Sequence, residues 1–275
     1  ATTTSSSLTD GDSHYFHLRT EDTVGNWSDN ADLGPFYIDL TKPTSTISDP
    51  VNGGTGSTLY TNSWTGTLGG SSADTLASVN SGVDHVDLSI TRSSDGLYWD
   101  GAAWVAGTEA TTRVTATGAP DWTYTTLTSP TEDIYTVTSH AVDNVTNVED
   151  SYVLTIVHDL TLPTVSSSIS PATPDLTNDW YGTEPTITIT GADDILLNHL
   201  EYQWNGTSGA WTTYTAPFTT FGEGGYTVYF RAIDEAGNVS AIGSGLVKYD
   251  KTELDNGALN LSISPNPTGG STATV

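Results

Sequence analysis

The stretch Ala232-Ile233-Asp234-Glu235-Ala236-Gly237-Asn238-Val239-Ser240 decides the fold, because it places an Asp-x-x-Gly-Asn turn between two β-type segments. Residues 226–230 before the turn are rich in aromatic and β-branched side chains, and the segment after it ends at Lys248-Tyr249-Asp250. Asp, Asn and Gly favour tight turns, and two such runs around a turn are typical of an antiparallel hairpin. The sequence therefore predicts a hairpin whose second strand ends in aspartate.

The same phrase occurs three times in the chain. The first copy has its turn at residues 21–28 and closes at Asp39, and the second has its turn at residues 141–147 and closes at Asp159. Matching aspartates lie roughly 16 or 17 positions apart within a copy, and the copies recur after about 120 and then about 91 positions, the size of one small β-sandwich. We therefore expect a tandem array of similar modules.

Composition supports an all-β fold class. Ser, Thr and Gly are frequent, whereas the strong helix formers are scarce. We expect strands in one module at residues 63–68, 83–91, 122–127, 134–141 and 152–157, with an aromatic hairpin between the second and third of them. In the next module we expect strands at residues 186–190, 200–204, 211–214, 226–233 and 245–249.

The turn followed by a strand that ends in Asp-x-Thr-x-Pro-Thr resembles the bacterial Ig-like and fibronectin type III-like repeats of large surface proteins and adhesins. Asp22, Gly25, Asn26, Asp39, Thr41 and Pro43 fit this pattern, as do Asp234, Gly237, Asn238 and Asp250, whereas Thr146 replaces the glycine in the middle copy. The resemblance implies tandem Ig-like β-sandwich modules in an extended array on the cell surface.

Four domains follow from these boundaries. Residues 1–44 are expected to be the C-terminal part of an Ig-like module, residues 45–163 and 164–254 two complete modules, and residues 255–275 the start of a further module or a sorting domain. Pro43 and Pro163 predict short, stiff linkers, because proline restricts itself and the preceding residue. The absence of methionine suggests a piece of a longer or processed product.

The charge of the chain restricts its partners. With 33 acidic against 7 basic residues, and a formal net charge of -26, it would repel nucleic acid and anionic lipid. We therefore expect no nucleic acid and no direct membrane insertion, and neighbouring copies or further modules, a surface glycan or another cell-surface protein as partners. The chain has no cysteine, so no disulfide holds these modules.

The aspartates of the turns have two interpretations. Asp22, Asp143 and Asp234 are expected to accept backbone N–H bonds within their turns, while Gly25 and Gly237 supply the positive φ angle. In an Ig-like sandwich, however, the loops after the second and sixth strands lie beside the linker that enters the module. That arrangement would bring acidic side chains together at each linker.

Calcium is the cofactor that such sites would hold. The two predicted sets of metal ligands are Asp39, Asp74 and Asp143, and Asp159, Asp193, Asp194 and Asp234. Asp10 or Asp12 would join the first set from the preceding module, and Glu132 or Asp133 the second. Ca²⁺ takes six to eight oxygen ligands, so the sequence predicts a structural Ca²⁺ site at each junction.

Paired aromatic residues offer a second candidate site. Trp99 and Trp104 flank an Asp-Gly turn, and Trp204 and Trp211 flank an Asn-Gly turn. Cross-strand aromatic pairs commonly stabilise hairpins, but flat indole faces can also stack on sugars. Glycan stacking is therefore the alternative interpretation of these four residues.

The sequence predicts no enzyme, since it contains no nucleophile elbow, phosphate-binding glycine loop or His-Glu-x-x-His motif. The expected function is a structural or adhesive segment of an extracellular surface protein, such as a stiff stalk or a component of a filament or surface layer. The alternatives are accessory carbohydrate-binding modules of a secreted enzyme and terminal modules of an exported cargo. Residues 261–268 echo residues 168–174 and are expected to open a further module, and together with the Thr-Ala-Thr-Val that follows they also resemble the start of a Bacteroidota-type sorting domain.

Overall fold

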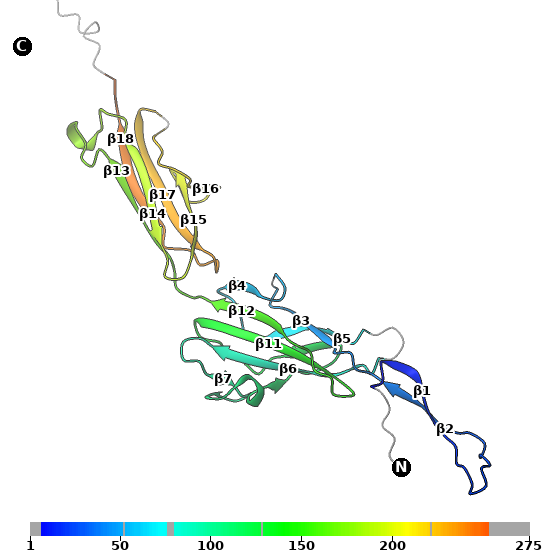
Figure 1. Cartoon of the computed structure of the whole chain (residues 1–275). Coiled ribbons are helices and arrows are strands. Elements are labelled where there is room, and N and C mark those ends of the chain that lie inside the picture. The colour runs from blue at the N-terminus through cyan, green and yellow to red at the C-terminus, as the bar shows by residue number, and fades with distance from the viewer. Residues whose placement is uncertain (1–6, 52, 76–79, 128, 221, 253–275) are drawn as a thin grey trace, which may run out of the picture. The chain divides into compact units, whose positions relative to one another are not determined.

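The computed structural model describes residues 7–51, 53–75, 80–127, 129–220 and 222–252 (Figure 1). Its regular structure consists of strands and two short 3-10 turns, η1 (Glu109–Thr111) and η2 (Thr177–Asp179), which confirms the all-β prediction. The chain forms two compact units, the first containing residues up to Pro163 together with Asp193–Leu197 and Asp234–Val239. Residues 255–275, the predicted start of a further module or a sorting domain, lie outside the described residues.

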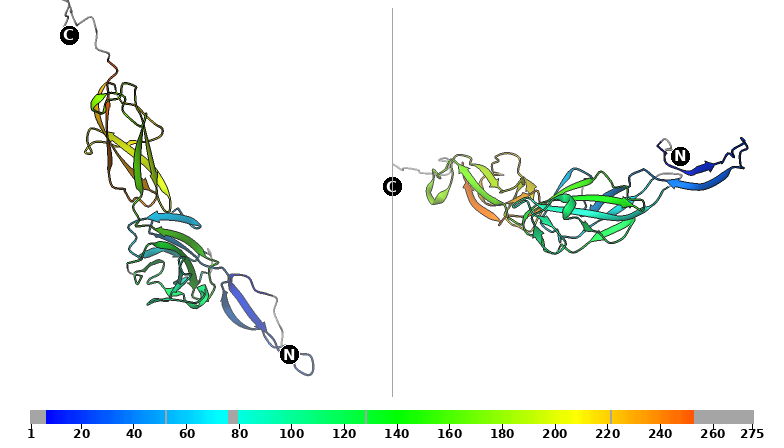
Figure 2. Two further views of the ribbon diagram at one scale, coloured as in Figure 1. Left: turned by 90° about the vertical axis from the view of Figure 1, so that its left-hand side faces the viewer. Right: turned by 60° about the horizontal axis from the view of Figure 1, so that its bottom comes forward.

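The first unit begins with a two-stranded antiparallel ribbon, β1 (Gly11–Leu18) and β2 (Ala31–Ile38), which both views of Figure 2 show as adjacent strands. In this ribbon, His14 of β1 lies opposite Phe36 of β2. Three apolar side chains on this ribbon, Phe16, Leu18 and Phe36, are between 42% and 51% exposed. The ribbon carries the first of the three turns, and its assignment to the C-terminal part of a module stays a prediction.

The first complete sandwich has two sheets. One sheet has the order β10-β5-β3, and the other has the order β4-β12-β11-β6-β7-β8, with β9 paired to β6. Their bounds are β3 (Thr44–Asp49), β4 (Ser57–Thr61), β5 (Leu68–Ala73), β6 (Val83–Arg92), β7 (Tyr98–Trp99), β8 (Trp104–Val105), β9 (Val114–Thr115), β10 (Asp121–Tyr124), β11 (Asp133–Asp143) and β12 (Tyr152–His158).

This strand order is that of an Ig-type sandwich, in which the sixth strand lies between the third and the seventh. Figure 1 shows β11 between β6 and β12, and β11 pairs antiparallel with both. Strand β4 adds to the same sheet by pairing parallel to β12. The two sheets enclose a core to which β11 contributes every second residue, including Tyr135, Val137 and Ala141.

The strand predicted at residues 63–68 is wrong. The structure has a loop between β4 and β5, anchored by Trp64, which is 6% exposed and donates a hydrogen bond from Nε1 to the carbonyl of Thr67. Gly66 in this loop has a φ of 89°, which interrupts extended backbone. The burial of Trp64 is thus achieved from a turn rather than from a strand.

The second unit contains a smaller sandwich of the same type. Its sheets have the orders β13-β14 and β16-β15-β17-β18. Isolated bridges add Phe218 to β14 and place Tyr181 parallel to Tyr249 of β18. The bounds are β13 (Thr164–Ser170), β14 (Thr186–Ala192), β15 (Leu197–Trp204), β16 (Thr212–Thr213), β17 (Gly224–Asp234) and β18 (Gly243–Tyr249). The core of this sandwich includes Ile187, Ile189, Val228 and Val247.

Candidate metal centre

The three Asp-x-x-x-Asn turns share one hydrogen-bond pattern. In the first turn, Asp22 Oδ1 accepts bonds from the backbone N–H groups of Val24 and Asn26. Asp143 accepts the equivalent pair from Val145 and Asn147. In the third turn, Asp234 Oδ1 accepts a bond from the N–H of Asn238 at 2.8 Å. The predicted turn-capping role of the three aspartates is confirmed.

The residue before the asparagine has a positive φ angle in all three turns. The values are 92° at Gly25, 74° at Thr146 and 89° at Gly237. The replacement of glycine by threonine in the middle copy therefore leaves the turn conformation unchanged, although a β-branched residue is strained there.

The first aspartate cluster consists of Asp39, Asp74 and Asp143. Asp39 follows β2, Asp74 follows β5 and Asp143 ends β11. Each offers a carboxylate oxygen within 4.8 Å of the other two, and their side chains are buried, with exposed fractions of 8%, 8% and 1%. The structure thus brings together the three ligands that the sequence predicts for the first site.

Backbone N–H groups partly neutralise the first cluster. Asp39 accepts bonds from the N–H groups of Thr41 and Ser81, and Asp74 accepts one from Gly82. Burial alone pushes the pKa of Asp39 upward, but the bonds from Ser81 and Thr41 and the contact with Asp74 outweigh it and hold this pKa below its usual value. The carboxylate of Asp39 is therefore stabilised in its charged form.

The second aspartate cluster consists of Asp159, Asp193, Asp194 and Asp234, which all belong to the first compact unit. Oxygens of Asp159, Asp193 and Asp194 lie within 4.8 Å of one another, whereas Asp234, the fourth predicted ligand, does not belong to this converging group. Burial raises the pKa of Asp159, and the charges of Asp234, Asp193 and Asp194 raise it further against the N–H bond from Thr161. Burial is the larger cause of this shift, and repulsion between like charges adds to it.

Three carboxylate oxygens of the two clusters are buried without a hydrogen-bond partner among the described residues. They are Asp74 Oδ1, Asp193 Oδ1 and Asp234 Oδ2. A buried charged oxygen without a partner carries a desolvation penalty, which a bound cation would offset. These oxygens, together with the carboxylates around them, suit a hard divalent cation such as Ca²⁺.

Sequence reasoning missed a second role of the turn asparagines. Asn147 donates a 3.0 Å hydrogen bond from Nδ2 to the backbone carbonyl of Asp39, and Asn238 makes the same bond to Asp159 at 2.9 Å. The asparagine thus ties the turn to the linker aspartate. Its fixed position, four residues after the turn aspartate, is the signal that could have revealed this role.

The prediction that Asp10 and Glu132 would join the metal ligands is not supported, because neither belongs to the carboxylate groups that converge in the structure. Instead, Asp10 accepts hydrogen bonds from the N–H of Leu40 and the hydroxyl of Thr41. Glu132 accepts the same two bonds from Leu160 and Thr161. We call this arrangement the linker clamp.

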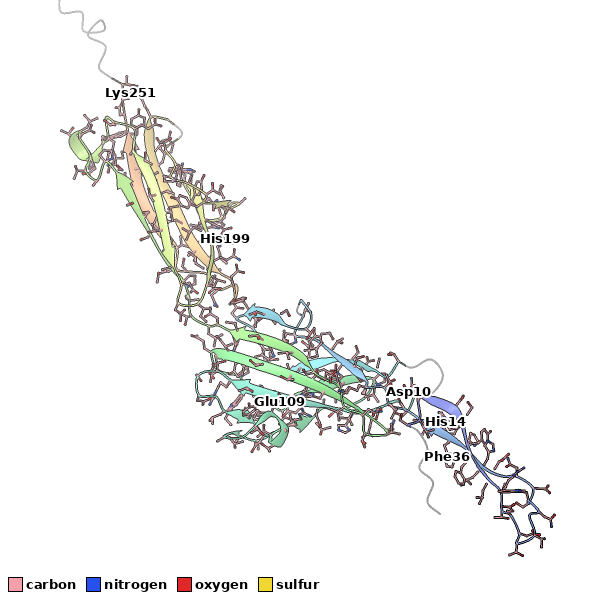
Figure 3. All side chains as sticks on the ribbon, in the orientation of Figure 1. Asp10, His14, Phe36, Glu109, His199 and Lys251 are labelled. Carbon is pink, nitrogen blue, oxygen red and sulfur yellow. The ribbon has the colours of Figure 1, made fainter. Side chains whose placement is uncertain are left out.

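The clamp recurs a third time in the second unit, where Glu223 accepts bonds from the N–H of Lys251 and the hydroxyl of Thr252. Figure 3 labels Asp10 beside the start of β1 and Lys251 beyond the end of β18. Each clamp carboxylate directly precedes the strand that leads into the Asp-x-x-x-Asn turn. Asp133, the alternative ligand, accepts a bond from the N–H of Ser94 instead.

The four tryptophans lie in packed environments. Trp99 and Trp104 face each other across the β7–β8 hairpin with ring centroids 5.5 Å apart, and both pack against the first core. Trp204 packs against Phe218 in the second core, and the guanidinium of Arg231 lies 4.3 Å from the ring centroid of Trp211. The hairpin interpretation accounts for these contacts, and glycan stacking stays a prediction.

Comparisons with known proteins add the following. No protein-family model and no curated protein matches the chain. The fibronectin(III)-like modules of Clostridium thermocellum CbhA match with 15% identity and a TM-score of 0.38, over 77% of this chain and 97% of that chain. The FN1–FN3 domains of chicken CNTN1 match with 11% identity and a TM-score of 0.37, over 85% of this chain and 76% of that chain.

These TM-scores and identities are too low to support an argument about function. Within the described residues, no helix is long and apolar enough to cross a bilayer. The strand orders of the two complete sandwiches make this chain a tandem of immunoglobulin-like, fibronectin type III-like modules.

Proposed function

We propose that this chain is a structural or adhesive segment of an extracellular surface protein, a stalk or filament component whose linkers are stiffened by Ca²⁺. Its partners are then further modules of the same protein, or a neighbouring surface molecule. One repeated hydrogen bond carries the proposal. The asparagine of an Asp-x-x-x-Asn turn donates to the backbone carbonyl of a linker aspartate, from Asn147 to Asp39 and from Asn238 to Asp159.

Two kinds of hydrogen-bonded contact recur at the linkers. The same clamp occurs after β2, β12 and β18, and the same asparagine bond occurs at two linkers. Repetition of a contact at successive linkers fits a mechanical role, because each linker then follows its module with the same local geometry. A catalytic role would instead place unique residues at one site.

Three observations support calcium as the stiffening agent. Carboxylates converge at both Asp39 and Asp159, a buried oxygen lacks a partner at each cluster, and the formal net charge of -26 concentrates cations around the chain. A cation bound at either cluster would join the linker aspartate to the two loops beside it.

A calcium titration with EDTA as the reversal tests the proposal. Thermal melting and small-angle X-ray scattering are measured on the wild-type chain and on the double variant Asp39→Ala/Asp159→Ala. We expect Ca²⁺ to raise the melting temperature and narrow the distribution of particle dimensions in the wild type only. The matched control Asp29→Ala/Asp121→Ala removes two exposed carboxylates and should respond as the wild type does.

An unchanged melting temperature and unchanged scattering in the wild type would remove calcium from the proposal. An equal response in the two double variants would show that Ca²⁺ acts by screening the overall charge and not at the clusters.

A further inference from the structure

The two aspartate clusters differ in how far the protein itself neutralises them. We propose that the second cluster binds Ca²⁺ more tightly than the first, so that the linker at Asp159 is stiffened at a lower calcium concentration than the linker at Asp39. This inference rests on the proposed function. It adds that the second cluster fills with Ca²⁺ before the first.

The number of carboxylate charges near the site is the first difference. The first cluster has three aspartates, and the second has Asp159, Asp193 and Asp194 together with Asp234, whose charge acts on Asp159. Calcium affinity in proteins is tuned by the number of charged ligands and by the rigidity of the site. Asp234 is not one of the carboxylates that converge within 4.8 Å, so each cluster offers three converging ligands, and the charge of Asp234 adds to the attraction for a cation at the second cluster.

Hydrogen bonding in the first cluster is the second difference. Both oxygens of Asp39 accept hydrogen bonds, from Thr41 and Ser81. Both oxygens of Asp143 also accept hydrogen bonds, from Val145 and Asn147. An oxygen that accepts an N–H bond has less electron density to offer a cation. Of the six carboxylate oxygens in this cluster, Asp74 Oδ1 is the one that is buried without a partner.

The second cluster has more oxygens available to a cation. The N–H groups of Ile195 and Leu196 both donate to Asp193 Oδ2, which leaves Oδ1 buried and without a partner in the described part of the chain. Asp234, which is not in the converging group, is 1% exposed; Asn238 donates to its Oδ1, and its Oδ2 has no partner among the described residues. In the described part of the chain no hydrogen bond reaches Asp159 Oδ2 or either oxygen of Asp194, so the three converging aspartates of this cluster keep more oxygens for a cation than those of the first cluster do.

Access to solvent is the third difference. Asp194 is exposed, whereas all three aspartates of the first cluster are buried. A hydrated cation can therefore reach a carboxylate of the second cluster before it loses its water, but it must enter the first cluster through the protein surface. The same difference predicts faster calcium exchange at the second cluster.

Isothermal titration calorimetry with Ca²⁺ at low ionic strength tests the order of filling. We expect two classes of sites in the wild type, with dissociation constants that differ by about tenfold or more. Asp194→Asn should weaken the tighter class and leave the weaker class unchanged, and Asp74→Asn should do the reverse. Asp194 is exposed, so its variant should fold as the wild type does.

Amide chemical shifts in the wild-type protein give a second readout that needs no variant. The amides of Ile195 and Leu196 should respond to Ca²⁺ at lower concentration than those of Ser81 and Gly82. Simultaneous responses, or the opposite order, would overturn this inference while leaving the proposed function intact. If neither set of amides responds and no heat of binding is measured, both the inference and the calcium part of the proposed function are wrong.

Discussion

The side-chain amide of Asn238 donates a 2.9 Å hydrogen bond to the backbone carbonyl of Asp159, and its Oδ1 accepts a 3.1 Å bond from Asn62. Asn238 is 7% exposed, so these bonds are shielded from water. One turn residue thereby fixes a linker 79 residues away in sequence. The same relationship joins Asn147 to Asp39.

Replacing this asparagine should therefore destabilise the linker region. Asn238→Ala leaves the buried carbonyl of Asp159 without its donor, at a cost of about 1–3 kcal/mol. The measurement is the midpoint of urea unfolding followed by tryptophan fluorescence. Asn26→Ala is the matched control: its turn is exposed, its amide is bonded to Asp22, and the expected loss is less than about 1 kcal/mol. Equal losses would contradict the role of Asn238 at the linker.

Removal of a clamp carboxylate should free one specific amide. In Glu132→Ala the N–H of Leu160 and the hydroxyl of Thr161 lose their acceptor, so hydrogen exchange at Leu160 should accelerate about tenfold, which corresponds to about 1.4 kcal/mol. Exchange is followed by NMR. Glu184→Ala, at an exposed position, is the control and should leave Leu160 unchanged. Unaltered exchange in Glu132→Ala would show that the clamp does not protect the linker.

The first turn should weaken in acid. The N–H and side-chain amide of Asn26, followed by the N–H of Val24, hold the pKa of Asp22 below its usual value. Because the folded pKa is depressed, this contribution is present above the unfolded pKa and is lost as the pH falls through the folded pKa. Amide exchange at Val24 and Asn26 should therefore rise in that acidic range, after correction for intrinsic exchange rates. The acid-dependent rise should disappear in Asp22→Asn, and its persistence there would assign it to another group.

A glycine in β5 should not tolerate a side chain. A Cβ at Gly70 would lie 1.8 Å from the carbonyl oxygen of Thr46 and 2.7 Å from Trp122, so β3 and β10 would both have to move. Gly70→Ala should destabilise this sandwich by about 2–3 kcal/mol, measured by urea unfolding. Gly206→Ala, where a Cβ meets no atom within 4 Å, should change stability by less than about 0.5 kcal/mol.

The effect of neutralising Asp159 should change sign with calcium. In EDTA, Asp159→Asn removes the burial of a charged carboxylate and its repulsion by Asp234, Asp193 and Asp194, and should raise the melting temperature. In saturating Ca²⁺ it removes a ligand and should lower the melting temperature relative to the wild type. Differential scanning calorimetry under both conditions measures this. A decrease under both conditions would mean that repulsion at this cluster does not limit stability.

Local chemistry determined much of this protein. The three turns follow from aspartate, asparagine and a residue with positive φ within five positions, because their hydrogen bonds close within the turn itself. The strands at residues 83–91, 134–141 and 152–157 follow from alternation, since a two-residue period places one face in the core. The convergence of Asp39, Asp74 and Asp143, and of Asp159, Asp193 and Asp194, could also be predicted, because the Ig-like strand order determines which loops meet.

Only the tertiary structure decided the rest. The clamp joins Glu132 to Leu160 across 28 positions, and no local pattern distinguishes that carboxylate from the many other acidic residues. The parallel pairing of β4 with β12 and the packing of Trp64 against Tyr135 likewise join segments that are far apart in the sequence. The unequal neutralisation of the clusters is decided there too, because the donors that reach Asp39 come from Thr41, beside it, and from Ser81, which only the folded chain brings near.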